Sequence, residues 1–547
     1  MMKEADKAAT LARPSAAQYA WQDMELGMFF HWFPDNAWNC GEPFDIEQQK
    51  KNAATLSCPD FDPAQWVQSA KDLGAKYIVF VAKHGYGLCR WRSEYGGFNF
   101  KYSKYPIDDI RADPLRSLAD ECRKNDIKLG IYLNASCDIF NIGDGGIARD
   151  PARQAEYTEL YRGWLKEVLT QYGDMVEIWF DGSMMLEAGD ILRQYAPNII
   201  IFQSKYANIR WVGQEEGYAS DPAWNTVSHL DGVTGVSIQR HGDPDGDCWM
   251  PLECDARLRR DWGYNDDPAN KLNSLDKLMD MYYNSVGHGA NLLINHAPAS
   301  TGRIRDDDMA RMKEFGDEIR RRFGHPVAVG EGEGEIVELD LGGVKTIDHV
   351  ITMEELSGGE RIRAYSIEGL DPETNEWVRL TGGIAVGHKK IDFFNARALS
   401  KIRIHVLKSV GTPLIRSISA HYAGVTPKIP EPVAYGEVCV REYGTEMYEI
   451  GNNWDAELSI SLDAFTKDAG QYRVSFRDSG DQAVDIDRAW VVMDGVRYDS
   501  YVERVGDTSE FNLFVGGPKA QIDFHVHIRP RRDWKLVKGE VYYYRMT

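Results

Sequence analysis

The chain has 547 residues, enough for about three domains at the usual 100 to 200 residues each. Its formal net charge of −21 disfavours nucleic acids and anionic membranes as partners, because neither is attracted to an acidic surface. A neutral or cationic small ligand fits this charge better. No apolar run reaches the roughly 20 residues that a membrane span requires, so we expect no membrane-spanning segment.

The first 326 residues alternate short apolar runs with helical patterns. Runs typical of buried strands occur at 26–32, 77–82, 129–133, 176–180, 199–203 and 290–295, with a further one at 235–239 or 249–254. Helical patterns occur at 62–73, 114–124, 155–172 and 306–323. Because strand and helix alternate without an antiparallel interruption, we predict an α/β fold with a TIM-like (β/α) barrel over residues 14–326.

The remainder of the chain has the texture of β-structure. Apolar and polar residues alternate in segments such as Glu335–Leu341, between glycine-rich turns, which predicts a β-sandwich over 327–424. A proline-rich linker at 426–432 then precedes a second β domain, 433–547, whose role the sequence does not indicate.

Polar side chains fall at the ends of four of the predicted barrel strands. These are His31, His84, Tyr132 and Asp181. A lone histidine is more often a core residue than a ligand, and Asp181 alone could simply cap a turn. However, a barrel brings the carboxyl ends of its strands to one mouth, so we expect the four to form a site together.

Several catalytic motifs are absent from the sequence, and their absence limits the reactions that such a site could catalyse. The sequence has no GxGxxG or P-loop, no GxSxG elbow and no metal-ligand spacing, so we expect neither a cofactor nor a metal. Two carboxylates could instead hydrolyse a glycoside, with Asp181 as nucleophile. Glu215, Glu216 and Glu253 are the candidates for the acid/base, and the residue pattern does not choose among them.

Seven segments in barrel order carry a resemblance to a known family. They are FFHW at Phe29–Trp32, AKYIVFVAKH at Ala75–His84, KLGIYL at Lys128–Leu133, EIWFDG at Glu177–Gly182, IRWVGQEEG at Ile209–Gly217, WMPLECD at Trp249–Asp255 and NLLINHAP at Asn291–Pro298. The sequence resembles the α-L-fucosidases of glycoside hydrolase family 29, more specifically the subgroup that prefers α-1,3/1,4-linked fucose. The resemblance covers residues 14–423 and implies that the 327–424 region is a discoidin-like domain.

The resemblance also implies roles for particular residues. It implies a retaining exo-glycosidase that releases terminal α-linked L-fucose from glycans, with Asp181 as nucleophile and Glu215 as acid/base, Glu253 being the second choice. The residues expected to bind the sugar are His31, His84, Tyr132, Arg259, Trp262 and Glu42. The partner is then a glycan substrate, and an external glycan favours a periplasmic or extracellular location, with the cytoplasm still open and the oligomeric state undecided.

Two segments depart from the family pattern. The family's KHHDGF is here Lys83–Leu88, with the sequence KHGYGL, and an expected Glu-Trp pair is replaced by Gly41-Glu42. An unpaired sugar hydroxyl or site group costs about 1 to 3 kcal/mol, so such changes can alter the sugar. The alternatives are an exo-glycosidase for another galacto-configured or substituted sugar, a non-catalytic glycan-binding protein, or a metal-dependent hydrolase using His31 and His84.

Overall fold

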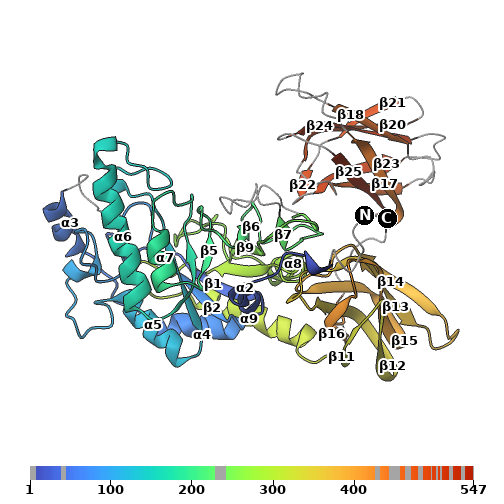
Figure 1. Cartoon of the computed structure of the whole chain (residues 1–547), viewed down its shortest axis with the longest axis horizontal. Coiled ribbons are helices and arrows are strands. Elements are labelled where there is room, and N and C mark those ends of the chain that lie inside the picture. Colours follow the sequence, from blue (N-terminus) through green and yellow to red (C-terminus); the bar gives the residue numbers. More distant parts are fainter. Residues whose placement is uncertain are drawn as a thin grey trace. The chain divides into compact units, whose positions relative to one another are not determined.

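The computed structural model describes residues 8–38, 45–227 and 242–425, followed by the strands of the C-terminal region between 432 and 545. Apart from two short segments, the chain divides at Gly424 into two compact units. The larger unit contains a barrel and an antiparallel sheet, and the helices and strands described for the smaller one are all strands (Figure 1).

Eight parallel strands form the barrel. In sheet order they are β5 (Ile200–Phe202), β4 (Met175–Trp179), β3 (Lys128–Leu133), β2 (Tyr77–Lys83), β1 (Leu26–Phe30), β10 (Asn291–Asn295), β9 (Leu252–Arg257) and β6 (Arg210–Trp211). A parallel bridge between Phe202 and Ile209 brings the two ends of the sheet together. The sheet is therefore a nearly closed, TIM-like barrel, and the predicted fold class is confirmed.

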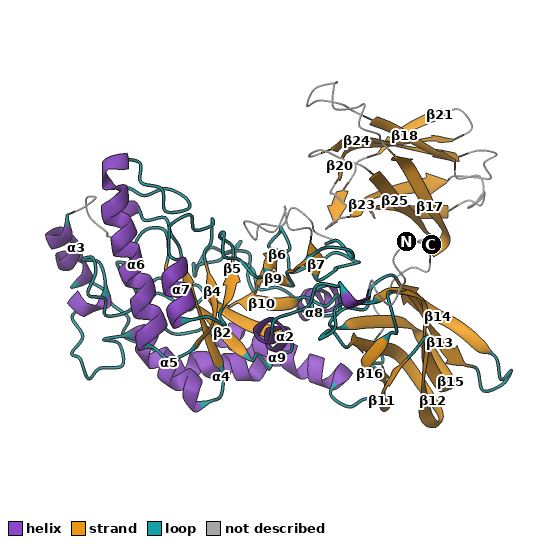
Figure 2. Cartoon of the chain, in the orientation of Figure 1, coloured by secondary structure: helices purple, strands orange, loops and turns teal. Residues whose placement is uncertain are grey.

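Helices cover the outside of these strands (Figure 2). They are α2 (Ala16–Gln22), α3 (Ile46–Ala53), α4 (Pro63–Leu73), α5 (Pro114–Lys124), α6 (Gln154–Gln171), α7 (Gly189–Tyr195), α8 (Leu275–Asn284) and α9 (Asp306–Phe323). The sequence specifies several helix starts locally: Asp62 and Asp113 each cap a helix whose first residue is proline. None of the described helices is long and apolar enough to cross a membrane.

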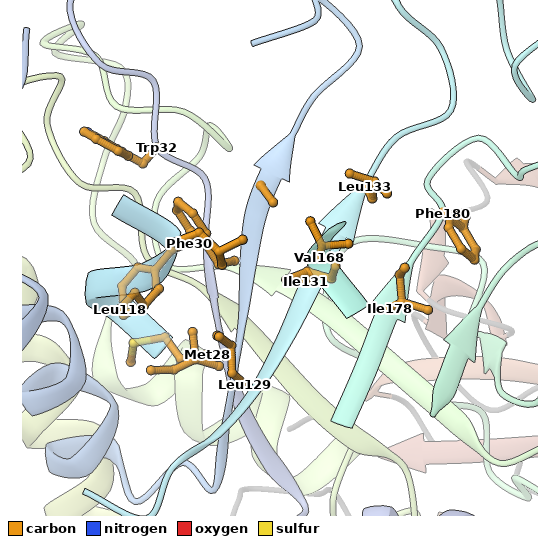
Figure 3. Packing of buried hydrophobic residues seen from close by; sticks show 14 of the residues in the cluster. Met28, Phe30, Trp32, Leu118, Leu129, Ile131, Leu133, Val168, Ile178 and Phe180 are labelled. Carbon is orange, nitrogen blue, oxygen red and sulfur yellow. The ribbon is translucent and has the colours of Figure 1, made fainter. Parts of the chain in front are cut away.

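Side chains alternate between two hydrophobic clusters along each barrel strand. Met28 and Phe30 on β1 point outward and pack against the helices (Figure 3). Phe29 belongs to a separate cluster inside the barrel. On β4, Ile178 is outward and Trp179 inward. This period of two continues beyond the strands, and it predicts that residues such as His31 and Asp181 face the barrel interior at its mouth.

The connection between β6 and β9 differs from the prediction. It contains an antiparallel pair, β7 (Thr226–Val227) with β8 (Cys248–Trp249), so the expected absence of an antiparallel interruption is wrong. A long connection must satisfy its own backbone groups, and local pairing does so. Of the two candidate strands, 249–254 overlaps β9, and 235–239 lies outside the described residues. The two-residue strand β6 escaped detection.

An antiparallel six-stranded sheet follows the barrel. Its order is β11 (Ala328–Glu333), β16 (Leu414–His421), β12 (Ile336–Glu354), β15 (Lys390–Ser409), β13 (Ile362–Leu370) and β14 (Trp377–Gly383). Register shifts between β12 and β15 interrupt these two long strands, and the sheet has its own buried cluster. The structure confirms β-structure in this region, in the form of one antiparallel sheet, whereas the β-sandwich bounds and the discoidin-like assignment stay predictions.

The smaller unit consists of antiparallel strands in two sheets. One sheet has the order β17 (Pro432–Glu442), β25 (Leu536–Arg545), β19 (Gly470–Asp478), β23 (Thr508–Val515) and β22 (Glu503–Val505). The other has the order β18 (Ala456–Ser461), β24 (Ile522–Pro530), β20 (Val484–Met493) and β21 (Val496–Ser500). The described strands agree with the β-rich texture of this part of the sequence.

Candidate active site

Asp181 lies directly after β4, at the mouth of the barrel. The Tyr132 hydroxyl donates a hydrogen bond to its Oδ2 at 2.8 Å, and the Asn134 side-chain amide donates to the Tyr132 hydroxyl at 3.1 Å. Gly182 and Ser183 then turn the chain with φ angles of 69° and 70°, in the left-handed region that favours glycine. The carboxylate of Asp181 is therefore held from one side by β3, and no donor among the described residues binds its other oxygen.

Two buried histidines lie beside this carboxylate. His31 Nδ1 is 2.9 Å from the Asn295 amide oxygen, and burial, then the charges of His84 and Arg90, lower its pKa to about 3. Burial, followed by the nearby Arg90 and Lys83, lowers the pKa of His84 to about 4. Both imidazoles are thus neutral near neutral pH, so they can donate and accept hydrogen bonds without adding charge.

Ring contacts join these residues into one surface. The His84 and Tyr132 rings are stacked with centroids 5.6 Å apart and planes 10° apart. His31 lies 5.8 Å from Tyr132 and 4.9 Å from the Trp262 ring. The structure therefore brings together the four polar residues at the ends of predicted strands, and Trp262, also predicted to bind the sugar, lies against His31.

Glu215 approaches the same mouth from the loop after β6. The Trp262 indole donates a hydrogen bond to its Oε2 at 2.8 Å, and the Arg257 guanidinium lies 3.6 Å from the same oxygen. The Glu215 side chain is 45% exposed, which leaves it accessible to a substrate. Glu216, its neighbour, is more exposed and is bound by Arg257 at 3.2 Å.

Glu253, on β9, lies inside the barrel and not at its exposed mouth. It is fully buried, with its oxygens accepting hydrogen bonds from the Tyr77 hydroxyl at 2.7 Å and the Trp179 indole at 2.9 Å. Burial, then the neighbouring Glu177 carboxyl, raises its pKa well above the usual range. A neutral, fully bonded carboxyl in the barrel interior suits a structural role better than proton transfer to a substrate.

Asp255 is a site residue that the sequence reasoning did not single out. Its carboxylate accepts a hydrogen bond of 2.6 Å from the Trp211 indole and lies within electrostatic reach of both Glu215 and Asp181. The alternation of residues along its strand could have identified it. Along β9, Leu252, Cys254 and Ala256 belong to the outer cluster, so the alternate residues, Asp255 among them, face inward.

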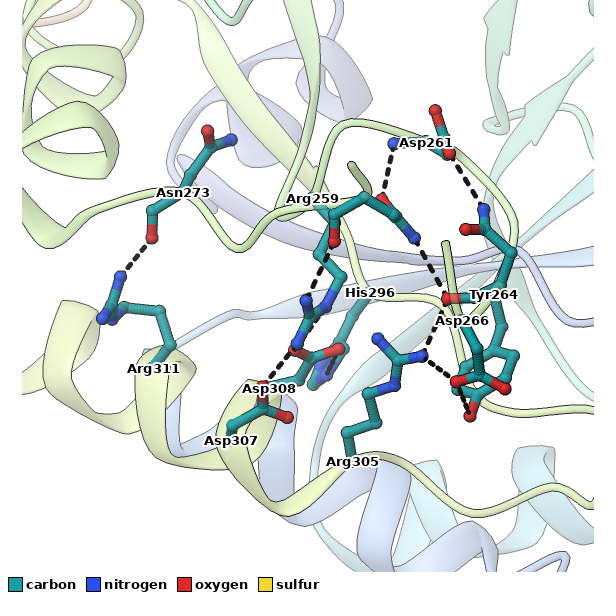
Figure 4. A network of polar contacts seen from close by, with 12 residues as sticks. Arg259, Asp261, Tyr264, Asp266, Asn273, His296, Arg305, Asp307, Asp308 and Arg311 are labelled. Atoms are coloured by element: carbon teal, nitrogen blue, oxygen red, sulfur yellow. Dashed lines mark hydrogen bonds and ion pairs between the residues drawn. The ribbon is translucent and has the colours of Figure 1, made fainter. Parts of the chain in front are cut away.

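Arg259 is placed differently from the other predicted sugar-binding residues. Its guanidinium donates to Asp308 at 2.8 Å, to Asp307 at 2.6 Å and to the Asn270 carbonyl at 3.1 Å (Figure 4). Each of its three nitrogens is therefore already bonded, two of them at the start of α9. Glu42, also predicted to bind the sugar, lies outside the described residues.

An aromatic wall occupies the place where the sequence departs from the family pattern. We use this name for Phe33, Trp38 and Tyr86. The Trp38 ring lies 4.4 Å from Tyr86 and 5.0 Å from Phe33, and Tyr86 lies 5.6 Å from His84. The buried Arg90 donates to the Tyr86 hydroxyl. Gly85 leaves room for Ser136, whose hydroxyl would be 2.9 Å from an added Cβ.

The arrangement has the components of acid/base hydrolysis. Two carboxylates, Asp181 and Glu215, are each oriented by one hydrogen-bond donor, and neutral imidazoles and aromatic rings lie beside them. In the part of the chain that the structure describes, no group of three His, Cys, Asp or Glu side chains is placed to hold a metal ion. A (β/α) barrel with such a mouth is the architecture of a glycoside hydrolase.

Comparison with known proteins specifies the family. The alpha-L-fucosidase family model matches residues 3–322, so the chain belongs to the alpha-L-fucosidase family, a family of glycoside hydrolases. It is 28% identical to alpha-L-fucosidase 1 of Arabidopsis thaliana over 457 residues, covering 74% of this chain and 86% of that protein. The prediction that this chain is a glycoside hydrolase of the fucose-releasing family is thereby confirmed.

Solved structures agree with this assignment. A crystallised candidate alpha-L-fucosidase from Bacteroides thetaiotaomicron is 31% identical to this chain, and the two structures superpose with a TM-score of 0.67. The match covers 75% of this chain and 99% of that protein. A second candidate alpha-L-fucosidase, from Bacteroides ovatus, superposes with a TM-score of 0.65. That match covers 96% of this chain and 94% of the other protein. At 22% identity the second match shows the fold alone.

Proposed function

We propose that the chain is a retaining exo-α-L-fucosidase in which Asp181 is the nucleophile and Glu215 the acid/base. The observation that carries this proposal is the pair of anchored carboxylates: Tyr132 orients one and Trp262 the other at the same mouth. Glu253 is the weaker choice for the acid/base, because its oxygens are buried and bonded.

The reaction proceeds by double displacement. Asp181 attacks the anomeric carbon, the glycosidic bond breaks, and Glu215 gives its proton to the leaving oxygen. Glu215 then takes a proton from water, and the water oxygen displaces Asp181 to release the sugar with its configuration retained. Tyr132 orients the Asp181 carboxylate for attack, because its hydroxyl donates a hydrogen bond to one carboxylate oxygen.

The neutral imidazoles of His31 and His84, with the rings of Tyr132 and Trp262, form the proposed sugar subsite. Fucose has hydroxyl groups that pair with imidazole nitrogens and apolar faces that pack on aromatic rings. Arg259 acts through the loop that carries Trp262, since its guanidinium is already bound to Asp307 and Asp308. Glu42 is proposed from the sequence resemblance alone.

Substrate and location are inferred from the same resemblance. The segment Ile209–Gly217 supports the subgroup that prefers α-1,3/1,4-linked fucose on branched glycans. An external glycan of this kind would place the enzyme in the periplasm or outside the cell, which fractionation of the source cells tests.

The antiparallel sheet of β11 to β16 braces the barrel. The ion pair of Lys389 with Glu25 and the 2.7 Å contact of His349 with Tyr283 support this role.

The test is hydrolysis of an aryl α-L-fucoside and of a fucosylated Lewis-type oligosaccharide, by the native chain and by Asp181→Ala. Fucose release by the native chain, abolished in the variant, is the expected result. The exposed surface variant Glu187→Gln serves as the control and retains activity. A folded native chain that releases no fucose from either substrate would contradict the proposal, and other galacto-configured aryl glycosides would then be tried.

A further inference from the structure

Two glutamates inside the barrel have no part in the proposed reaction. We call Glu177, on β4, and Glu253, on β9, the glutamate pair; both side chains are fully buried. The Trp179 indole donates to both of them, at 2.6 Å to Glu177 Oε1 and at 2.9 Å to Glu253 Oε2. A side-chain hydrogen bond also joins the two carboxyl groups directly. Because an ionised carboxylate can only accept hydrogen bonds, one member of the pair must carry a proton.

The donors that hold the pair are uncharged. The Trp21 indole, on α2, donates to Glu177 Oε2 at 2.9 Å, and the Tyr77 hydroxyl, on β2, donates to Glu253 Oε1 at 2.7 Å. Among the described residues no arginine, lysine or histidine acts on either carboxyl group. Two ionised carboxylates in contact, without a cation and away from water, would be very costly. A shared proton removes this cost.

Two glycines on neighbouring strands make room for this arrangement. A Cβ added at Gly27, on β1, would lie 2.4 Å from Cζ of the Tyr77 ring, and one added at Gly130, on β3, would lie 3.1 Å from Cβ of Glu177. Both distances are shorter than ordinary van der Waals contact, so a larger side chain would displace a member of the group. The inner surface of the barrel is therefore fitted to the glutamate pair and to its tyrosine donor.

The titratable groups that face the glutamate pair oppose the loss of its proton. They are Tyr77, from β2, and Asp255, from β9. The neighbours from α2, β4 and β10 do not titrate: they are Trp21, Trp179 and Asn291. Burial, then the charge of Glu177, raises the pKa of Glu253 well above its usual range, and the charge of Asp255 acts in the same direction. Burial also raises the pKa of Glu177.

We propose that the glutamate pair shares one proton and is a pH-sensitive link inside the barrel, which joins α2, β2, β4 and β9 while the proton is present and weakens when it is lost. The inference does not depend on the proposed reaction. Because the pair releases this proton at higher pH in the folded chain than in the unfolded chain, its contribution to stability is complete at low pH. That contribution is lost as the pH rises through the folded pKa of the pair.

Infrared spectroscopy tests for the shared proton directly. At neutral pH the difference spectrum between the native chain and either Glu177→Gln or Glu253→Gln should show the loss of one protonated-carboxyl band. The remaining glutamate ionises in each variant, because the amide N–H of the new glutamine replaces the shared proton as its donor. Glu167→Gln is the control, since Glu167 is also buried and accepts from an indole, that of Trp91 at 2.9 Å; this variant keeps the band. Loss of the band in only one member of the pair, or in neither, overturns the proposal.

Thermal melting measures the effect on the fold. The melting temperature of the native chain should fall between neutral pH and about pH 9, a range in which buried glutamates can titrate. The fall should be smaller in Glu177→Gln and in Glu253→Gln, which lack the shared proton, and unchanged in Glu167→Gln. An equal fall in the native chain and in both pair variants overturns the inference, and two reciprocal variants keep the test decisive where one of them does not fold. Since no substrate is used, the absence of fucose release would contradict the proposed function and leave this inference standing.

Discussion

The two sides of the barrel mouth differ in chemistry. On the side of β1 to β3 lie the neutral imidazoles of His31 and His84 and the aromatic wall. On the side of β4, β6 and β9 lie three carboxyl groups, those of Asp181, Glu215 and Asp255. The first side can hold a sugar without charge, and the second can attack it and exchange protons. Tyr132 joins them, since its ring stacks on His84 and its hydroxyl binds Asp181.

The largest effect is expected for the nucleophile on the carboxylate side. Asp181→Gly should lower kcat/KM on an aryl α-L-fucoside by about 10⁴-fold or more, because no other group can form the covalent intermediate. Added azide should restore part of the rate and give a fucosyl azide of inverted configuration. A variant that hydrolyses at more than a tenth of the native rate would contradict the assignment.

A smaller effect, dependent on the leaving group, is expected for the acid/base. Glu215→Gln should lower kcat/KM on a fucosylated oligosaccharide by about 10² to 10⁴-fold, and much less on an aryl fucoside whose leaving group needs no proton. Glu253→Gln is the matched control, because the Glu253 carboxyl is buried and already bonded to Tyr77 and Trp179, and burial raises its pKa well above the usual range. If Glu253→Gln shows the leaving-group dependence and Glu215→Gln does not, the roles are exchanged.

The residue that joins the two sides should show an intermediate effect. Tyr132→Phe removes the 2.8 Å hydrogen bond to Asp181 and keeps the ring that stacks on His84. Losing a hydrogen bond to a charged group costs about 1.5 to 3 kcal/mol, or about 10 to 150-fold in kcat. Tyr264→Phe, at an exposed hydroxyl bound to Asp266, serves as the control. An equal loss of kcat in both variants would show that the hydrogen bond from Tyr132 to Asp181 has no particular role in catalysis.

The smallest effect concerns stability on the neutral side. Burial lowers the pKa of His84 to about 4, so between about pH 4 and 6.5 the unfolded chain binds a proton that the folded chain does not. Stability should therefore fall as the pH drops from about 6.5 towards 4. In His84→Asn this loss of melting temperature should be smaller, whereas the exposed His325→Asn should match the native chain. An identical pH dependence in His84→Asn would show that its imidazole is not buried neutral.

Much of this comparison could be predicted from the sequence. Short apolar runs between helical patterns are local features, so the strands that end at or just before His84, Tyr132 and Asp181 were found from the residues alone. Because a barrel gathers its strand ends, their proximity followed from the fold. The period of two along β9 also contained the information that Asp255 faces inward, although a run of mixed polarity hides it.

Other features depend on contacts between distant segments. The bonds of Arg259 to Asp307 and Asp308 join residues nearly fifty positions apart, and no local pattern predicts them. Strand β6 is only two residues long, too short for any period to be detected. The aromatic wall replaces an expected His-Asp pair with Tyr86, and only the structure shows that its ring packs on Trp38.

The identity of the nucleophile is the central claim, and covalent trapping tests it most directly. The native chain would be incubated with a 2-deoxy-2-fluoro-L-fucosyl fluoride, which forms the glycosyl-enzyme quickly and releases it slowly, and its peptides would then be analysed by mass spectrometry. We predict one added fluorofucosyl group on the peptide that contains Asp181. A label on Glu215 or Glu253, or continued turnover of the reagent with no labelled peptide, would contradict the assignment.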